Sequence, residues 1–331
     1  MGRKNNSGKI IKIVLLILFV SGCNNQEDSK VPLNIIDNNY IVSPFSAAVD
    51  EGIINNNVDS NYDLYEIEAG LLRHSKKYFS PLDYYYESGK ILTRDYLKEL
   101  IEKLNEDEAI KVDYIYEQNF KNKEDDLKGM SLGIIVNLND VEITEEDFEE
   151  KVKIKIGIIN KFLENIDEAK KIKKVIGIYL EEKEETLIPG NYRYKILIDN
   201  NRIGKLINID EKYYLFPTAL SKERDLNTYN FFKKIETEFQ EKSNSPFSVV
   251  GRGFYLDGKC QSLFINVDLF LANNTDVLST AQFLQKTINE NTNYSLDFEL
   301  NILVKNNDKV RYFIIKEKNK QAAITTFLTD F

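Results

Sequence analysis

The amino end of the chain constrains most strongly where and how the rest can fold. Four basic residues precede an apolar run from Ile13 to Val20, namely Arg3, Lys4, Lys9 and Lys12. The positive charges favour retention of this end in the cytoplasm, and the apolar run is shorter than the ~20 residues that a spanning helix needs. This pattern is typical of a cleaved export signal, so we expect the body to fold outside the cytoplasm.

The apolar run ends in Val20-Ser21-Gly22-Cys23, which resembles the lipobox of bacterial lipoproteins. The small side chains of Ser21 and Gly22 allow an extended backbone to enter a peptidase cleft. The resemblance implies cleavage between Gly22 and Cys23 by the signal peptidase for lipoproteins, and a diacylglycerol on the Cys23 thiol. At about 0.8 kcal/mol per buried methylene, two acyl chains would hold the mature chain on the extracellular face of the cell membrane. The alternative is a coincidental cysteine beside an uncleaved or ordinarily cleaved segment.

The charge of the mature chain excludes some classes of partner. Removal of residues 1–22 leaves 309 residues with 40 basic and 53 acidic side chains, a net charge of −13. Such a surface repels nucleic acid and anionic lipid head groups, so we expect neither as a partner and assign membrane attachment to the lipid. Cys260 is the only other cysteine, so no disulfide within the body is expected.

The remainder divides into a tether and a body. Residues 23–61 are rich in Asn, Asp and Ser and lack periodicity, which predicts a tether with a reach of roughly 30–35 Å. Its apolar patches Leu33–Ile36 and Ile41-Val42 could still pack on the body. The body spans 62–331, and it could divide into halves 62–220 and 221–331.

The body alternates helical and extended patterns. Apolar periodicity predicts helices at 62–78, 93–104, 144–170, 222–242 and 279–289. Strands are predicted at 84–86, 111–120, 130–138, 175–180, 192–198, 247–256, 261–270, 296–305, 310–316 and 322–327. Asp257-Gly258 is a strong signal for a two-residue hairpin. A helix followed by a strand pair recurs about four times, which predicts an α+β fold with mainly antiparallel sheets rather than a doubly wound parallel sheet.

Four stretches of the body resemble one known family. They are Lys128–Leu138, Ile188–Tyr192, Asp210–Pro217 and Phe247–Gly258. Their order and spacing are similar to those of the CamS family of sex pheromone precursor lipoproteins, and the likeness extends from about Asp63 to the carboxyl end. None of these stretches is a catalytic signature.

The resemblance implies that the family's named activity lies in the discarded signal peptide. A heptapeptide released from just before the anchor would act as a conjugation pheromone. In this chain the heptapeptide would consist of Leu16, Ile17, Leu18, Phe19, Val20, Ser21 and Gly22. The sequence departs from the peptide for which the family is named. Because any signal peptide has an apolar centre, a stretch that serves export alone is the alternative.

No residue of the body forms a recognisable catalytic or metal-binding pattern. Gly253–Cys260 comes close to a phosphate-binding loop, but it lacks the final hydroxyl and lies within a predicted hairpin. We therefore expect Gly251 and Gly253 at a bulge or a close crossing. His74 is the only histidine, which excludes multi-histidine sites and favours a place at the edge of the core. Cys260 is expected to be a buried structural thiol.

Carboxylate runs and exposed aromatics are the remaining candidates. The acidic runs at 124–126, 145–147 and 181–185 lack the spacing of a calcium loop, so we expect solvated faces. Five tyrosines could stack on sugars or peptides, namely Tyr84, Tyr85, Tyr86, Tyr213 and Tyr214. No catalytic residue, metal or cofactor is predicted.

Three functional classes remain open. The first is a non-enzymatic domain that binds a component of the cell envelope. The second is the solute-binding lipoprotein of a transporter, which would need parallel βαβ halves around a hinge. The third is an envelope hydrolase, for which the sequence offers no pair of nucleophile and base. A cleft that gathers ionisable groups from different elements would separate the first class from the third.

Overall fold

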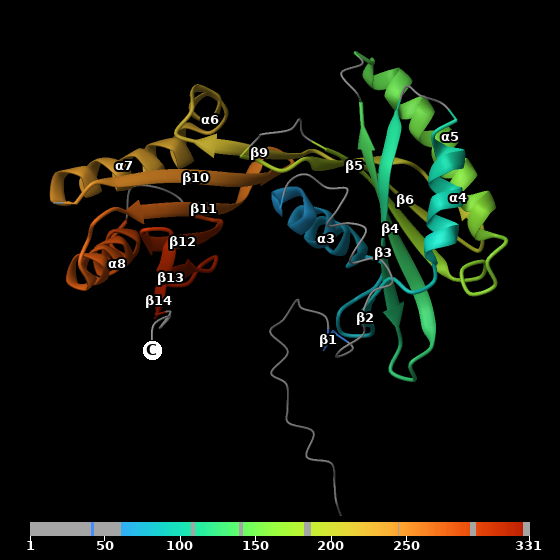
Figure 1. Cartoon of the computed structure of the whole chain (residues 1–331), viewed down its shortest axis with the longest axis horizontal. Coiled ribbons are helices and arrows are strands. Elements are labelled where there is room, and N and C mark those ends of the chain that lie inside the picture. Colours follow the sequence, from blue (N-terminus) through green and yellow to red (C-terminus); the bar gives the residue numbers. More distant parts are fainter. Residues whose placement is uncertain are drawn as a thin grey trace, which may run out of the picture. The chain divides into compact units, whose positions relative to one another are not determined.

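A computed structural model describes residues 41–42, 61–106, 110–138, 142–181, 187–243, 245–291 and 296–326. They form two mixed, mostly antiparallel sheets with packed helices, so the predicted α+β class is confirmed (Figure 1). The predicted signal peptide, Cys23 and the heptapeptide of residues 16–22 lie outside the described residues. Within the described part, no helix is long and apolar enough to cross a membrane.

The first sheet contains eight strands. Seven of them lie side by side in chain order, and β8 pairs with β6. The strands are β1 (Ile41–Val42), β2 (Tyr85–Ser88), β3 (Lys111–Lys121), β4 (Leu127–Asn137), β5 (Lys173–Leu180), β6 (Asn191–Asp199), β7 (Arg202–Ile203) and β8 (Ile207–Asn208). Only the pairs β1–β2 and β4–β5 are parallel. Ile41-Val42, in the predicted tether, thus contributes an edge strand next to Tyr85 and Tyr86.

The second sheet contains six strands in the order β14-β13-β12-β11-β10-β9. They are β9 (Glu211–Phe216), β10 (Phe247–Leu256), β11 (Lys259–Leu269), β12 (Glu299–Asn306), β13 (Lys309–Lys316) and β14 (Ala323–Thr326). The pair β11–β12 is parallel and the others are antiparallel. The predicted boundary between the two halves of the body, near residue 220, falls after β9. The second sheet already begins at Glu211, the first residue of β9.

The predicted succession of a helix and a strand pair occurs four times. The described helices are α3 (Asn61–Ser75), α4 (Arg94–Leu104), α5 (Glu145–Leu163), α6 (Ala219–Arg224), α7 (Leu226–Lys242) and α8 (Asn274–Asn289). Helices α4, α5, α7 and α8 each precede a hairpin. Because α5 and α8 cross over between neighbouring hairpins, they place β4 beside β5 and β11 beside β12 in parallel.

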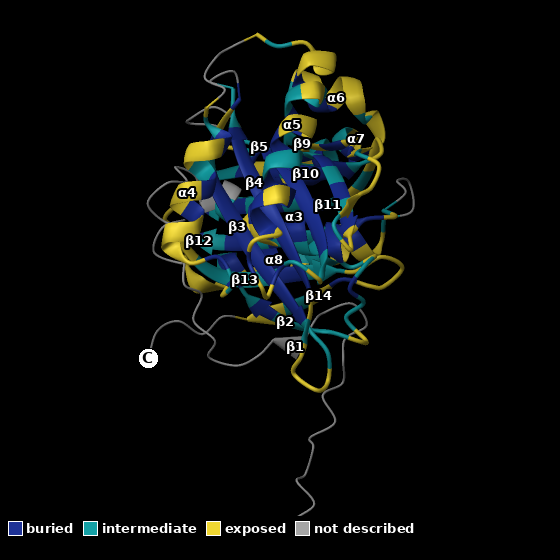
Figure 2. Ribbon diagram, turned by 90° about the vertical axis from the view of Figure 1, so that its right-hand side faces the viewer, coloured by how far each residue is buried: buried dark blue, intermediate teal, exposed yellow. Residues whose placement is uncertain are grey.

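The two sheets differ in how they are buried. In the first sheet, Leu100 of α4 and Ile159 of α5 pack on one face, and Ile67 and Leu71 of α3 pack on the other. Burial on both faces explains why the sequence of β4 is nearly all apolar. Helices α7 and α8 cover one face of the second sheet, and buried and half-buried residues alternate along β12 (Figure 2).

The predicted helix at 222–242 is wrong in one respect, because the chain forms two helices there. Asp225 separates α6 from α7 and its side chain accepts a hydrogen bond from the Thr228 backbone N–H at 3.0 Å, which caps α7. The same carboxylate accepts a hydrogen bond from Tyr255 at 3.0 Å. A tertiary contact therefore fixes the break between the two helices.

The hairpin at Asp257-Gly258 is confirmed. Both residues have positive φ, 50° and 71°, as a type I′ turn requires. The stretch Gly253–Cys260 therefore joins two strands and is not a phosphate-binding loop. A Cβ on Gly251 would lie 2.7 Å from the Phe232 ring, so this glycine allows close packing of α7 on β10, whereas the bulge lies at Phe254-Tyr255.

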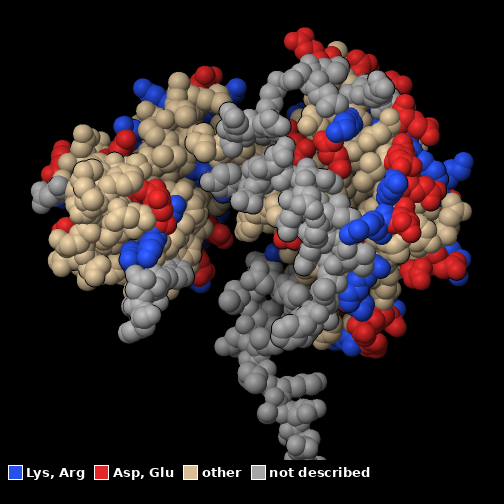
Figure 3. All heavy atoms as spheres, in the orientation of Figure 1, with Lys and Arg blue, Asp and Glu red and all other residues tan. Residues whose placement is uncertain are grey.

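Charged residues of both signs lie on the outer helices, and Figure 3 shows red and blue side chains over this part of the surface. The two signs are mixed along α4, whereas in α5 the acidic residues fill the first turns and the lysines follow. Lys103 pairs with Glu99, and Lys153 with Glu149, both at 2.6 Å and one helical turn apart. The acidic run at 124–126 is exposed and the run at 145–147 opens α5, whereas residues 182–185 of the third run lie outside the described part.

Candidate functional site

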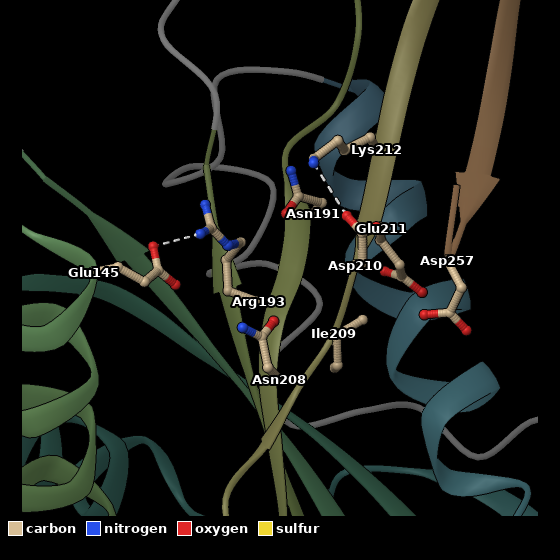
Figure 4. A pocket seen from close by; sticks show the side chains of 9 residues that line it. All are labelled: Glu145, Asn191, Arg193, Asn208, Ile209, Asp210, Glu211, Lys212 and Asp257. Atoms are coloured by element: carbon tan, nitrogen blue, oxygen red, sulfur yellow. Dashed lines mark hydrogen bonds and ion pairs between the residues drawn. The ribbon is translucent and has the colours of Figure 1, made fainter. Parts of the chain in front are cut away.

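A polar pocket lies where the chain passes from the first sheet to the second. Between β8 and β9, the Ile209 backbone N–H donates to Arg193 O on β6 at 2.9 Å, and the Asp257 N–H donates to Asp210 O at 2.9 Å. These bonds hold one extended segment against both sheets. The pocket has a volume of about 550 Å³ and is lined by Glu145, Asn191, Arg193, Asn208, Ile209, Asp210, Glu211, Lys212 and Asp257 (Figure 4).

Most charges that line the pocket are already paired. Arg193 Nη2 lies 2.7 Å from Glu145 Oε2, and Lys212 Nζ lies 3.1 Å from Asp210 Oδ1. The Tyr194 hydroxyl also donates to Glu145 at 2.6 Å. This hydrogen bond and the Arg193 charge hold the pKa of Glu145 below its usual value. Beyond these two pairs, Glu211 and Asp257 add two further carboxylates to the lining.

Glu211 forms the buried wall of the pocket. Its Oε1 accepts a hydrogen bond from Arg73 Nε at 2.9 Å and lies 3.0 Å from His74 Nε2. Burial alone would raise the pKa of Glu211, but the contact with His74 and the Arg73 charge outweigh it, so the pKa lies below its usual value. Neither Glu211 Oε2 nor Asn191 Oδ1 has a hydrogen-bond partner among the described residues.

A buried network links α3 to the second sheet behind this wall. Arg73 Nη2 donates to Glu66, which also accepts a hydrogen bond from the Tyr213 hydroxyl. The Arg73 guanidinium lies 4.4 Å from the centre of the Phe254 ring. Burial raises the pKa of Glu66 despite the nearby guanidinium. We call Glu66, Arg73, His74, Glu211 and Tyr213 the α3–β9 network.

His74 lies deeper and closer to charges than its sequence pattern indicates. Its ring is 4% exposed, packs edge-on against Tyr192 at 5.3 Å, and has Lys195 Nζ at 3.2 Å from Nδ1. Burial lowers the pKa of His74, with the Arg73 and Lys195 charges adding to the effect and Glu211 opposing it.

Cys260 is half-buried in β11. Its thiol lies 3.6 Å from the Ser262 carbonyl. Burial raises the pKa of the thiol to about 12. Such a thiol is protonated at neutral pH, and it is therefore a poor nucleophile.

The five candidate aromatics do not come together. Tyr84 packs edge-on against Phe79 at 5.6 Å, Tyr85 is half-buried, and the Tyr86 hydroxyl lies 3.1 Å from that of Tyr116. These three belong to the first sheet or the turn before it. Tyr213 and Tyr214 belong to β9 in the second sheet, and Tyr213 is part of the α3–β9 network.

Tyr214 lines a second pocket next to the first. This pocket has a volume of about 230 Å³ and is lined by Asp210, Lys212, Tyr214, Arg224, Tyr255 and Gly258. Asp210 and Lys212 line both pockets. The two pockets therefore adjoin along the start of β9.

No sequence pattern indicated a binding role for Asn191, Glu211 or Asp257. A signal was nevertheless present, because these residues belong to three of the four stretches that carry the family resemblance: 188–192, 210–217 and 247–258. The pocket gathers ionisable groups from different elements, as an enzyme site would. These groups come from α5, β6, β9 and the β10–β11 turn. However, no Ser, Cys or His is among its lining residues, and the described residues contain no cluster of three groups that could hold a metal ion.

Comparison with known proteins identifies the family. The family model described as the CamS sex pheromone cAM373 precursor matches residues 45–322. The chain therefore belongs to the CamS family. No curated protein matches the chain.

Two solved structures are similar in fold. A sex pheromone precursor from Lactobacillus salivarius superposes with a TM-score of 0.75 at 21% identity, covering 86% of this chain and 94% of that one. The C-terminal domain of the sex pheromone staph-cAM373 precursor from Staphylococcus aureus superposes with a TM-score of 0.68 at 20% identity, covering 82% and 98%. The mixed sheets differ from the parallel βαβ halves expected of a solute-binding lipoprotein.

Proposed function

We propose that this chain is a lipid-anchored surface precursor. Signal peptidase cuts before Cys23, the acylated thiol holds the body on the outer face of the membrane, and residues 16–22 leave as a conjugation pheromone. The observation that carries the proposal is the tetrapeptide Val20-Ser21-Gly22-Cys23 ahead of a body that belongs to the CamS family. The similar protein from Lactobacillus salivarius is itself described as a sex pheromone precursor.

The body acts in this proposal as a non-enzymatic binding domain of the envelope. The pocket between the sheets supports binding, because its side chains are held in place by ion pairs and hydrogen bonds. Glu145 and Asp210 are each paired with a cation, which makes these two carboxylates less suited to act as a general acid or base. Asp257 is exposed in the same pocket, but no Ser, Cys or His lies among the lining residues to act with it as a nucleophile and base pair.

Lipidation is tested with an alkyne-tagged palmitate analogue fed to cells that express the full chain. We expect label on the wild-type chain and none on Cys23→Ala, which should accumulate as uncleaved precursor because the peptidase acts on the acylated cysteine. Cys260→Ala is the matched control and should keep the label. An unlabelled wild-type chain, or a mature amino terminus at another residue, would contradict the anchor.

Release of the peptide is tested by mass spectrometry of the culture medium. We expect the heptapeptide of residues 16–22 in medium from wild-type cells and its absence with Cys23→Ala. Its apolar composition favours passage through a membrane after cleavage. If only longer signal fragments are found, the pheromone role is lost while the anchor stands.

A further inference from the structure

The two sheets share one topology. Strands β2 to β7 of the first sheet correspond, in chain order and in position, to β9 to β14 of the second, with α4 in the place of α7 and α5 in the place of α8. The pairing agrees at every step, because β4–β5 and β11–β12 are parallel and the four other pairs of each set are antiparallel. The second half of the body is therefore a structural repeat of the first.

The repeat identifies one face of the second sheet that differs from its counterpart. Helices α4 and α5 pack on one face of the first sheet and α3 packs on the other. Because crossovers between parallel strands are right-handed, α7 and α8 cover the face that corresponds to that of α4 and α5. The opposite face, which we call the open face, corresponds to the one under α3. No described helix of the second half corresponds to α3.

The side chains of the open face form two rows across β10, β11, β12 and β13. Residues paired between neighbouring strands point to the same face. The rows consist of Val250, Asn266, Leu303 and Phe313, and of Arg252, Phe264, Asn301 and Ile315. Val250 is 42% exposed and the other seven are half-buried. Among the described residues, none of the five apolar side chains in these rows belongs to a hydrophobic core.

These rows are more apolar than a solvated face requires. The solvent face of an antiparallel sheet normally carries polar side chains, whereas the open face presents Phe264, Leu303 and Phe313 on three neighbouring strands. A contiguous apolar surface of this kind indicates an interaction site.

The first half of the body shows which kind of element covers such a face. Ile67 and Leu71 of α3, one helical turn apart, pack there on residues from β3, β4, β5 and β6. The corresponding strands of the second sheet are β10, β11, β12 and β13, which are the strands that carry the two rows. The repeat therefore favours an α-helix as the occupant of the open face.

The charges on the open face favour an acidic helix. Asp268 and Lys305 continue the face beyond the rows and are paired with each other, with Nζ and Oδ1 3.9 Å apart. Together with Arg252, this face carries two cations and one carboxylate, although the chain as a whole has a net charge of −9. Complementary charge on a partner selects it against other amphipathic helices.

We propose that the open face binds an amphipathic, acidic α-helix of a partner protein. Apolar side chains at positions i, i+3, i+4 and i+7 of that helix pack on Phe264, Leu303 and Phe313, and an acidic side chain lies beside Arg252. This inference rests on the proposed role of the body as a binding domain of the envelope, and it names the kind of partner.

The test is fluorescence anisotropy of a labelled helical peptide titrated with the full mature chain at a fixed concentration of nonionic detergent. The probe is a designed peptide of about 18 residues, or five turns, with Leu on one face and Glu at its flanks. A second peptide has the same composition with its Leu residues distributed around the helix, and a third has Lys in place of Glu. We expect the first to bind with a dissociation constant of about 10–100 μM and the other two at least fivefold more weakly.

Phe313→Thr should weaken binding of the first peptide about fivefold or more, because an aromatic side chain is lost from the contact. Arg252→Gln, which removes no apolar side chain, should weaken it about two- to threefold. Leu278→Gln is the matched control, because this leucine is 39% exposed on α8, in the helix layer on the other side of the sheet, and it should leave binding unchanged. Circular dichroism of each variant confirms that it is folded.

The proposal is overturned if the first peptide does not bind, if the peptide with distributed Leu binds as tightly, or if Leu278→Gln weakens binding as much as Phe313→Thr. A dimer in sedimentation velocity that dissociates on Phe313→Thr would assign the open face to a second copy of the chain and also overturn it. Palmitate labelling of Cys23 and release of the heptapeptide are read separately, so these results leave the anchor and the pheromone role untouched.

Discussion

Arg73→Met is expected to lower the free energy of unfolding by about 3–5 kcal/mol, because it leaves two carboxylates buried without their cation. The Glu66 and Glu211 side chains are 4% and 0% exposed, and Arg73 contacts both. The substitution keeps the length of the apolar stem but removes the guanidinium, so the loss includes its contact with the Phe254 ring as well as the two ion pairs. Urea denaturation of the full chain, followed by circular dichroism, measures the change.

Two comparisons make this prediction specific to the α3–β9 network. Arg193→Met breaks the exposed pair with Glu145, whose carboxylate is 55% exposed, and should change stability by less than about 1 kcal/mol. Adding Glu66→Gln to Arg73→Met should recover part of the lost free energy of unfolding, because one of the two buried carboxylates without a cation is removed. Equal effects of Arg73→Met and Arg193→Met would show that burial does not control the energy of these pairs.

Acidification from pH 7.5 to 5.5 is expected to destabilise the chain through His74. Burial lowers the pKa of folded His74 below the 6.5 of an exposed histidine. As the pH falls through 6.5, the unfolded chain therefore takes up a proton that the folded chain does not, and the free energy of unfolding decreases. One such group gives a slope of at most about 1.4 kcal/mol per pH unit, and the loss ends below the folded pKa.

The groups that face His74 determine how this effect is isolated. Glu211 on β9, Arg73 on α3 and Lys195 on β6 surround the ring. Glu66 works in the opposite direction, because its raised pKa keeps a proton on the folded chain at pH values where the unfolded carboxylate is ionised. The lowered pKa of Glu211 acts only below about pH 4.5.

His74→Gln is the matching variant for this experiment. It removes the titrating imidazole and retains Glu66 and Glu211, so the difference in pH slope between wild type and variant isolates the histidine. We expect a shallower loss of stability in His74→Gln between pH 6.5 and 5.5. Identical slopes in the two proteins would rule out His74 as the source.

Most local features of the fold could be predicted from the sequence. Thr93 and Thr144 were expected to open helices, and their side chains accept hydrogen bonds from the backbone N–H groups of Tyr96 and Asp147. The Asp257-Gly258 turn lies where its two residue types predict it. These features depend on a few neighbouring residues, so sequence patterns are sufficient to place them.

Strand β9 shows where local patterns fail. It begins with Glu211, a charged residue that by sequence belongs on the surface, and no strand was predicted there. In the structure that carboxylate is buried because Arg73, 138 residues earlier in the chain, contacts it. The parallel pairing of β4 with β5 and of β11 with β12 was likewise not predicted. A series of hairpin patterns does not indicate which strands pair across a connecting helix.

The sequence by itself determined the α+β class, the helix caps, the hairpin and the family resemblance, because each depends on short-range patterns of polarity and backbone preference. Only the tertiary structure decided that Asn191, Glu211 and Asp257 line one pocket and that Arg73 neutralises the buried carboxylates behind it. The physical reason is that a charged residue can be buried only where its partner is also present, and here the partners come from distant parts of the chain.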